Sequence, residues 1–465
     1  MNFSHPKFAV VGHPNKGKSS IVSSLALDDS VQISDTPGTT IKKRSFPLMA
    51  DGKILYELYD TPGFQRARQV LAWLKQHDVS ADKKQEVVQA FINTHQGDKR
   101  FSDEVELLEP IMEGAGIIYV VDGSKPYGQE YEAEMEILRW TGRPSMALIN
   151  LIDQTNYEEE WKRALGQYFK MVRVFSPMKA TFGEHLQLLE SVAQLKEEWI
   201  VPIKNSIECF KQYYGQMLQQ SAEAITQLVA ESLSYVEQLD LKGEEATLAE
   251  EEKVEQKYKR ALRGLEHRSQ KNIEMIWHHG HLQKEVRDLA FEKIDLFSKQ
   301  SVSIFGLTQK ELIFTGATGG AITGAGVDLL LAGHTLLLGG AIGAVVGGAS
   351  AYFGFEKLAK IKVLGQKLGQ KYLQVGPMVN QNFPFILLGR ALYHARMVAS
   401  RSHAQREKLK LEMNETFKNQ WLDESIRKSL YRHHKKFQSE AEIDAEDIKT
   451  YEKLILEILK KCINV

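Results

Sequence analysis

The sequence predicts an α/β domain with a mostly parallel sheet, followed by a mainly α-helical region that contains a glycine-rich helical hairpin. Up to about Trp199, apolar runs of strand length alternate with helical patterns, as in a parallel sheet covered by helices. From Pro202 to about Gly306 the sequence is charged and contains no further proline, which is typical of a helical bundle or stalk. The segment 312–355 then carries a single charged residue, Asp328, among many glycines.

These changes of composition predict four segments. They are an N-terminal domain of residues 1–200, a helical bundle or stalk over 201–310, the glycine-rich hairpin over 311–356 and a C-terminal helical region over 357–465. The stretch between Phe64 and Gly114 is longer than one crossover helix requires, so we expect two helices there, with an insertion at about 79–110. The strands expected in the first domain are Phe8–Val11, Ile54–Tyr59, Gly116–Val121, Ser145–Leu151 and Val172–Phe175.

Length, charge and cysteine content narrow the class of protein. A chain of 465 residues is too long for one hydrophobic core, which predicts two or three domains. The 59 basic residues nearly balance the 60 acidic ones, so no overall field attracts the chain to nucleic acid, and we do not expect nucleic acid as a partner. Cys209 and Cys462 lie far apart, which argues against a disulfide framework, and the N-terminus lacks a secretory signal. We therefore expect a cytoplasmic protein.

Residues Gly12–Ser19 form a Gly-xxxx-Gly-Lys-Ser phosphate loop (P-loop) between the first apolar run and a helical pattern. Glycine at both ends lets the backbone wrap a chain of phosphates, so that successive amides and the following helix N-terminus face the anion. We expect Lys18 to reach the β- and γ-phosphates and Ser19 to hold Mg²⁺. The nucleotide-binding residues predicted from this motif are Gly12, Asn15, Lys16, Gly17, Lys18, Ser19 and Ser20.

Two segments downstream complete the predicted phosphate site. The motif Asp60–Gly63 ends a predicted strand, where the aspartate would bind Mg²⁺ through water and the Gly63 amide would sense the γ-phosphate. The polar segment Pro37–Thr40 supplies Thr40, which we expect to close over Mg²⁺ in the triphosphate state; the alternative is a plain turn. The predicted metal ligands are therefore Ser19, Thr40 and Asp60.

The segment Asn150–Asp153 predicts recognition of guanine. It ends a predicted strand, and the Asp153 carboxylate there accepts hydrogen bonds from the N1 and N2 groups of guanine, a donor pair that adenine does not offer. Ser176 follows the next predicted strand and would place a backbone amide at the guanine carbonyl. We therefore expect GTP and GDP as ligands.

These motifs in this order resemble the TRAFAC-class, translation-factor-type GTPases, and most closely the Era- and TrmE-like branch, whose P-loop also reads Gly-x-Pro-Asn-x-Gly-Lys-Ser. The whole chain resembles a bacterial family in which such a domain precedes a C-terminal domain of unknown function with a glycine-rich segment. The well-understood part of this resemblance covers residues 1 to about 200. It implies a Mg²⁺-dependent enzyme that hydrolyses GTP to GDP, with catalytic residues Lys18, Thr40, Gly63 and Asn15.

The chain departs from the usual GTPase pattern at two positions, and the resembled branch shares the second departure. Leu151 stands where a lysine normally covers the guanine plane, which predicts weaker affinity without a change of base. Phe64 stands where Ras-like enzymes carry the glutamine that orients the attacking water. Members of the resembled branch recruit K⁺, held partly by the asparagine that matches Asn15; the alternative is an asparagine that only braces the loop. Candidates for an arginine finger in cis are Arg44, Arg66 and Arg68.

Residues 311–356 predict a helical hairpin that enters a membrane. Its two halves are each about 20 residues long, enough to span the hydrocarbon of a bilayer, and glycine stripes let two helices approach closely. The lysine-rich stretch 357–371 follows, as on a cytoplasmic flank. Asp328 argues against insertion, and the alternative is a soluble hairpin buried under the flanking helices. The stripes are Gly316, Gly320 and Gly324, and Gly339, Gly343 and Gly347.

The sequence therefore predicts a membrane-associated GTPase on the cytoplasmic side that acts as a switch or as a remodelling machine, with membrane lipid as a partner through 311–356. A protein partner or self-association stays open. The alternatives are a soluble Era-like ribosome or RNA assembly factor and a dynamin-like machine that oligomerises on lipid. The basic helix Ile386–Lys410 favours a solvated surface over a lipid or RNA contact. Metal binding is not favoured for the histidines at 278–281 and 433–434.

Overall fold

The computed structural model describes residues 5–26, 44–50, 53–77, 79–153, 155–178, 180–241, 245–277, 294–315, 359–365, 371–400, 422–439 and 443–463. These residues form two compact units, of which the first extends to Tyr214 and the second holds the described residues from Gly215 onward. Helix α8 (Glu197–Ser234) contains residues of both units. The domain boundary predicted at residue 200 therefore falls inside a continuous helix.

The first unit is built on a six-stranded sheet with the strand order β2-β3-β1-β4-β5-β6. Pairing is parallel except between β2 and β3, which are antiparallel. The prediction of a mostly parallel α/β sheet is confirmed, and the strand that the sequence did not predict is β2, which contains Pro47. The strands are β1 (Lys7–Val11), β2 (Arg44–Ala50), β3 (Lys53–Asp60), β4 (Gly116–Asp122), β5 (Ser145–Asn150) and β6 (Val172–Val174).

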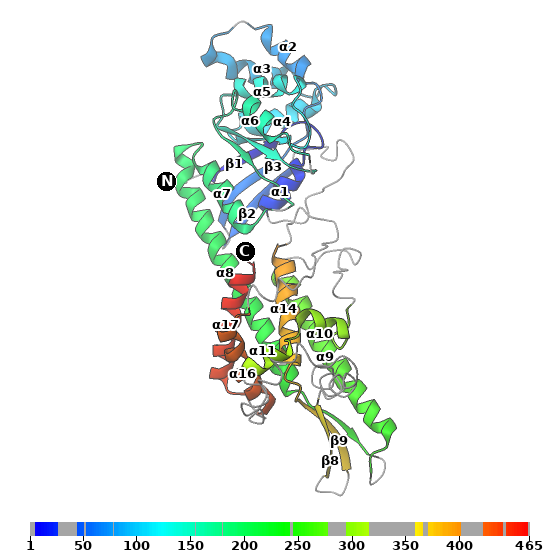
Figure 1. Cartoon of the computed structure of the whole chain (residues 1–465). Helices are drawn as coiled ribbons and strands as arrows, with labels where there is room; N and C mark the ends of the chain where they lie inside the picture. Colours follow the sequence, from blue (N-terminus) through cyan, green and yellow to red (C-terminus); the bar gives the residue numbers. More distant parts are fainter. Residues whose placement is uncertain are drawn as a thin grey trace, which may run out of the picture. The chain divides into compact units, whose positions relative to one another are not determined.

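The central strands direct alternate side chains into two cores, one on each face of the sheet. In β1, Ala9 and Val11 belong to one core, whereas Phe8 and Val10 belong to the other. A strand buried on both faces needs near-continuous apolar sequence, which is what β1 and β4 have. The first core is covered by α2 (Ala67–Lys75), α3 (Lys84–His95), α4 (Ser102–Met112), α5 (Glu130–Trp140) and α6 (Glu158–Leu165), and the second by α1 (Lys18–Ala26), α7 (Phe182–Ala193) and the start of α8 (Figure 1).

The segment between β3 and β4 differs from its prediction. It contains the three α-helices α2, α3 and α4 together with the short 3₁₀ helix η1 (Ala81–Lys83), where two helices were expected. Helix α4 contacts β1, and α3 contacts α2, α4 and α5. Helix α3 and most of α4 lie within the range 79–110 that was predicted as an insertion. The added helices thus pack on the same face of the sheet as α5.

The second unit is mainly helical, as predicted, but it also contains a small sheet. Its strands are antiparallel in the order β7-β9-β8, and they fall in regions that were expected to be helical. The physical reason is that apolar residues recur at every second position of β8 and β9, as a β-strand requires. Ile361 and Val363 of β8 lie opposite Val375 and Leu373 of β9. These strands are β7 (Glu237–Asp240), β8 (Ala359–Gly365) and β9 (Lys371–Met378).

A buried ion pair joins three helices of the second unit. The Arg390 guanidinium donates to both carboxylate oxygens of Glu266, and its Nη1 also donates to the Ser301 hydroxyl at 3.0 Å. Arg390 is 2% exposed, so the expectation of a solvated basic surface is wrong at this residue. Arg401, Arg406, Lys408 and Lys410 of the same basic stretch lie outside the described residues.

The described helices of the second unit are the later part of α8, α9 (Leu248–Ile276), α10 (Lys299–Phe305), α11 (Gln309–Thr315), α14 (Phe383–Ser400), α16 (Glu424–Ser439) and α17 (Ala445–Ile463).

The predicted glycine-rich hairpin at 311–356 falls almost entirely outside the described residues, which end at Thr315 and resume at Ala359. Within the described part of the chain, none of the helices is both long enough and apolar enough to cross a membrane. Among these same residues, no group of three or more histidine, cysteine, aspartate or glutamate side chains is placed to hold a metal ion. Instead, His434 is buried in the helical core, where its Nε2 lies 2.9 Å from the Tyr451 hydroxyl.

Candidate nucleotide site

The P-loop Gly12–Ser19 links β1 to α1 at the carboxyl edge of the sheet, which is where α/β folds bind ligands. Its two glycines have positive φ angles of 146° at Gly12 and 82° at Gly17. A Cβ atom at Gly12 would collide with the Val120 carbonyl of β4, and one at Gly17 would collide with the Asn150 amide. Only glycine therefore fits at these two positions, because both the backbone angle and the close approach exclude a side chain.

Lys18 is the buried cation of the loop. Its Nζ donates to the His13 carbonyl at 3.1 Å, and only 8% of the residue is exposed. Burial lowers the pKa of Lys18 to about 8, although the Asp60 carboxylate acts in the opposite direction. A phosphate chain bound in the loop would supply the negative charge that favours the ammonium form.

Ser19 and Asp60 form the oxygen-rich pair that the sequence predicted for Mg²⁺. The Ser19 hydroxyl donates to Asp60 Oδ2 at 2.8 Å, which joins the start of α1 to the end of β3. A hydroxyl and a carboxylate are the hard oxygen ligands that Mg²⁺ prefers, so these residues fit the ion. The remaining predicted ligand, Thr40, lies outside the described residues.

The motif Asp60–Gly63 is packed against the P-loop. The Thr61 hydroxyl donates to the Val10 carbonyl at 2.8 Å, and the Phe64 amide donates to the Gly12 carbonyl at 3.3 Å. A Cβ atom at Gly63 would lie 2.6 Å from the backbone nitrogen of Pro14, so this contact requires glycine. Phe64 is 1% exposed and its ring belongs to the core under α2–α6. Its side chain therefore fills the core and is absent from the nucleotide side.

The predicted base-recognition segment, Asn150–Asp153, is attached to the P-loop and to the residues after β4. The Asn150 side-chain amide donates to the Lys16 carbonyl at 3.2 Å. The Asp153 amide donates to the Ser124 hydroxyl at 2.7 Å, and the Asp153 side chain itself is exposed. The Ser176 hydroxyl donates to the Leu151 carbonyl at 3.1 Å, which places Ser176 beside the predicted guanine segment. These bonds attach Asn150 to the P-loop, Asp153 to the segment after β4, and Ser176 to Leu151, which follows Asn150 in the chain.

Asp122 and Ser124 connect the two halves of the site, and the sequence analysis missed both. The Ser124 amide donates to Asp122 Oδ1 at 3.0 Å, while Asp122 Oδ2 lies 3.8 Å from the Lys16 ammonium and 3.7 Å from that of Lys125. Lys16 is 6% exposed, so its side chain forms a buried ion pair while its backbone supports Asn150. The sequence signal was a polar Asp-Gly-Ser following the apolar β4.

His13 and Arg66 also make contacts that the sequence did not predict. Nδ1 of His13 lies 2.8 Å from Glu134 on α5, whose carboxylate also accepts the Tyr119 hydroxyl. The guanidinium of Arg66, a candidate arginine finger, donates to the Arg100 carbonyl at 2.6 Å. In this conformation Arg66 is therefore bound to the turn before α4. The predicted residues Asn15 and Ser20 lie in the loop and in the first turn of α1, and Asn15 has a φ angle of 61°.

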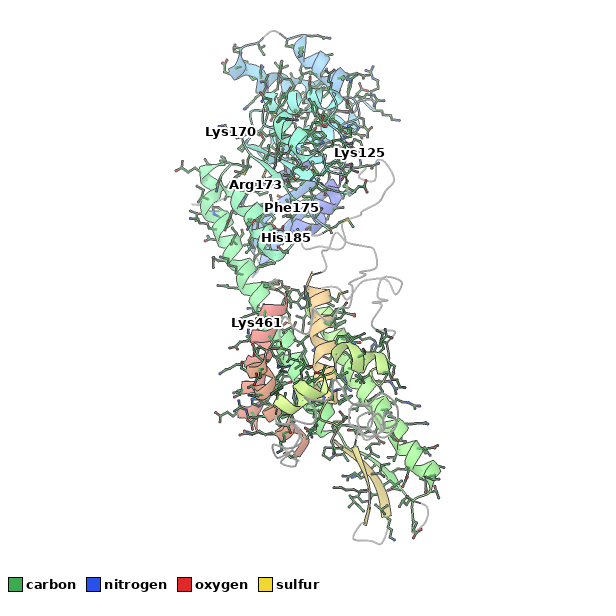
Figure 2. The ribbon with its side chains drawn as sticks, in the orientation of Figure 1. Lys125, Lys170, Arg173, Phe175, His185 and Lys461 are labelled. Carbon is green, nitrogen blue, oxygen red and sulfur yellow. The ribbon has the colours of Figure 1, made fainter. Side chains whose placement is uncertain are left out.

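Helix α7 supports the P-loop helix from the second face of the sheet. His185 on α7 places Nε2 2.6 Å from the Ser24 hydroxyl of α1, and its ring lies edge-on to Phe175 at 5.3 Å. Figure 2 labels His185 and Phe175 together with Arg173 of β6. A cavity of about 470 Å³ is lined by residues 173–176, Ala180 and α7 side chains. No P-loop residue lines it, so we do not assign the nucleotide to this cavity.

Two family models match the chain. Residues 7–151 match the family described as 50S ribosome-binding GTPase, and residues 162–458 match the family described as a domain of unknown function, DUF3482. The first match contains the P-loop, Asp60–Gly63 and Asn150, which are the residues assembled at the edge of the sheet. The second match covers more than half of the chain.

Curated relatives match parts of the chain. GTPase Der of Agathobacter rectalis is 35% identical over 96 residues, which are 20% of this chain and 22% of that protein. The tRNA modification GTPase MnmE of Pseudothermotoga lettingae is 24% identical over 210 residues, which are 43% of this chain and 36% of that protein. The chain thus spans well under half of the length of these relatives.

Two solved structures of Era are also similar to the chain. A single-residue variant of Aquifex aeolicus Era bound to GDP.AlF4⁻ shows 13% identity and a TM-score of 0.29, and the match covers 58% of this chain and 89% of that one. Era in complex with MgGDPNP and nucleotides 1506–1542 of 16S ribosomal RNA has the same identity and TM-score, and the match covers 59% and 89%. The resemblance to the Era- and TrmE-like branch is confirmed by the sequence matches. The chain belongs to the DUF3482 family, and its N-terminal part is a P-loop GTPase domain similar to those of Der and MnmE.

Proposed function

We propose that the first unit binds GTP and hydrolyses it to GDP, and that the chain works as a molecular switch. The observation that carries this proposal is the convergence of three groups on one loop. These groups are the buried Lys18, the hydrogen-bonded pair of Ser19 with Asp60, and the segment Asn150–Asp153. Lys18 is suited to bind the phosphates, Ser19 with Asp60 to bind the metal ion, and Asp153 to bind the base.

Each residue of the site has a separate role in nucleotide binding and hydrolysis. Amides of the P-loop and the start of α1 bind the phosphate oxygens, and Lys18 adds a positive charge at the β- and γ-phosphates. Ser19, Asp60 and the predicted Thr40 would hold Mg²⁺, which when bound neutralises charge on those phosphate oxygens. The Gly63 amide would donate a hydrogen bond to the γ-phosphate, and this bond distinguishes GTP from GDP. The Asp153 carboxylate selects guanine, and the Asn150 amide stabilises the loop that carries the phosphates.

Water activation requires a group other than the side chain after Gly63. Phe64 occupies that position and is packed in the core, so it cannot orient a water molecule. We expect K⁺ to take part, held partly by Asn15, because MnmE is among the relatives and Asn15 matches the asparagine of that branch. A bound K⁺ would supply positive charge where transition-state charge builds up.

Nucleotide binding should depend on pH because Lys18 is neutral above its pKa of about 8. Binding of phosphates raises that pKa, so the protein should take up protons on binding, and affinity should fall about fourfold between pH 7 and pH 8.5. Calorimetry in two buffers with different ionisation enthalpies measures the proton uptake. Lys18→Ala should lose tight binding at every pH. Constant affinity without proton uptake would contradict a direct phosphate contact by Lys18.

Base choice should change when the Asp153 carboxylate becomes an amide. Asp153→Asn should weaken GTP binding and favour xanthine nucleotides, because an amide can donate to the carbonyl that xanthine carries where guanine carries its amino group. Competition between labelled GTP and unlabelled XTP measures the preference, and the exposed Asp82→Asn on η1 is the matched control. A variant that keeps its GTP preference would show that guanine is recognised elsewhere.

Hydrolysis should be faster in potassium than in sodium buffers at equal ionic strength, by about tenfold if one well-placed charge is involved. Steady-state release of phosphate measures this ratio. Asn15→Ala should bring the two rates together, because the variant cannot help to hold the ion. Equal rates for the unaltered protein would leave Asn15 with a structural role in the loop.

We further propose that segment 311–356 attaches the GTPase to a membrane. The support is its sequence, with apolar length, two glycine stripes and the lysine-rich stretch 357–371, since the segment lies outside the described residues. An Era-like association with ribosomal RNA is the competing function, favoured by the family description that matches residues 7–151 and by the Era complex with 16S ribosomal RNA.

Cell fractionation separates these functions. A membrane-inserted chain should sediment with membranes and stay there after high-salt and alkaline washes, because burial of apolar surface is not screened by ions. The double variant Gly320→Leu with Gly343→Leu should insert poorly while it still binds GTP. Release from ribosomes by salt would favour the RNA function, and a dynamin-like machine should oligomerise on added vesicles. A protein that stays soluble and monomeric without detergent or lipid would contradict the membrane proposal.

A further inference from the structure

Glu104 on α4 holds the backbone just after the motif Asp60–Gly63. Its Oε1 accepts the Gln65 amide at 2.9 Å and the Arg66 amide at 2.5 Å, across 39 and 38 residues of sequence. Glu104 is fully buried and lies in the range 79–110 that the sequence marked as an insertion. A glutamate from the added helices therefore binds two consecutive amides of the predicted γ-phosphate-sensing segment.

The position of these amides makes a carboxylate suitable. Gln65 and Arg66 immediately precede α2, and the Arg66 side chain provides no capping bond for that helix. Amides at a helix N-terminus carry partial positive charge, so a carboxylate there is stabilising. Burial of a carboxylate is costly unless it is hydrogen-bonded, and the two amide bonds to Oε1 offset part of that cost, whereas Oε2 is buried without a hydrogen-bond partner among the described residues. Glu104 thus accepts the amide of Arg66, the N-cap residue of α2, and the amide of the residue before it.

The rest of the segment is fixed to the P-loop. Asp60 accepts the Ser19 hydroxyl, the Phe64 amide donates to Gly12, and Gly63 lies against Pro14. The two bonds from Glu104 come directly after these contacts along the chain. The segment is therefore held by the P-loop over residues 60–64 and by α4 over the next two residues.

We propose that Glu104 is a positioning residue for GTP hydrolysis, which keeps the Gly63 amide in place through the Gln65 and Arg66 amides. It also links the added helices to the nucleotide site, because a displacement of α4 would pull on this segment. The Arg66 guanidinium strengthens the link, since it donates to the Arg100 carbonyl just before α4. This inference rests on the proposed hydrolysis of GTP, whereas the contact of Glu104 with the two amides can be tested without it.

Two variants of Glu104 in the full chain test the proposal. Glu104→Met fills a similar volume without an acceptor, and Glu104→Gln keeps one acceptor oxygen without the charge. Glu86→Gln on α3 is the control, because it removes an exposed carboxylate from the same added region. The measurements are the single-turnover rate of GTP hydrolysis, the affinity for GDP, and hydrogen exchange of the amides at 65 and 66 with GDP and with a non-hydrolysable GTP analogue.

For Glu104→Met we expect hydrolysis about tenfold slower and exchange at residues 65 and 66 at least about tenfold faster, because two charge-assisted hydrogen bonds are lost. The affinity for GDP should stay within about twofold, since GDP has no γ-phosphate for Gly63 to contact. Glu104→Gln should lie between Glu104→Met and the unaltered protein, and Glu86→Gln should match the unaltered protein in every measurement.

Three results would overturn the proposal. One is an unchanged hydrolysis rate in Glu104→Met, and another is unchanged protection of the amides at 65 and 66. The third is faster exchange throughout the first unit with an equal loss of GDP affinity, which would show that Glu104 only stabilises the fold. If the unaltered protein hydrolyses no GTP, the proposed function fails, whereas the exchange comparison still decides whether Glu104 positions the segment.

Discussion

The close approach of the P-loop to the ends of β3, β4 and β5 is the constraint on which the rest of the first unit depends. Gly12 lies against the Val120 carbonyl, Gly17 against Asn150, and Pro14 against Gly63. A side chain at any of the three glycines would push the loop away from a strand. The same contacts hold the predicted phosphate and base residues together, so the packing that permits the fold also assembles the site.

Several charged side chains are buried beside the P-loop. Lys18 and Asp60 are both buried beside the loop, and a buried ion pair of Lys16 with Asp122 lies near the predicted base-recognition segment. Buried ion pairs contribute little to stability on balance, but loss of one partner is costly, so such pairs define one arrangement. Ser124 extends this pair to the Asp153 backbone. The P-loop and the predicted guanine segment are therefore connected through a polar network inside the protein.

The added helices α3 and α4 give the first unit a feature that the catalytic motifs do not include. They supply aromatic and aliphatic side chains to the core that holds Phe64, and α4 supplies Glu104 to the backbone after it. The second unit uses a comparable device, in which Arg390 joins Glu266 of α9 and Ser301 of α10. In both units a buried charge from one helix binds groups that lie far away in sequence.

The sequence by itself determined the α/β class of the first unit and the P-loop, and it predicted the guanine segment, because these depend on local periodicity and on motifs whose residues are adjacent. It missed β2, which contains Pro47, a residue that is rare inside sheets, although Asp51-Gly52 after it is a hairpin signal. It also missed the small sheet of the second unit. Only the tertiary structure placed Glu104 on the Gln65 and Arg66 amides, Asp122 beside Lys16, and Arg390 in a buried ion pair. Each of these contacts joins residues far apart in the chain. The sequence alone does not show whether a charged residue faces water or a buried partner.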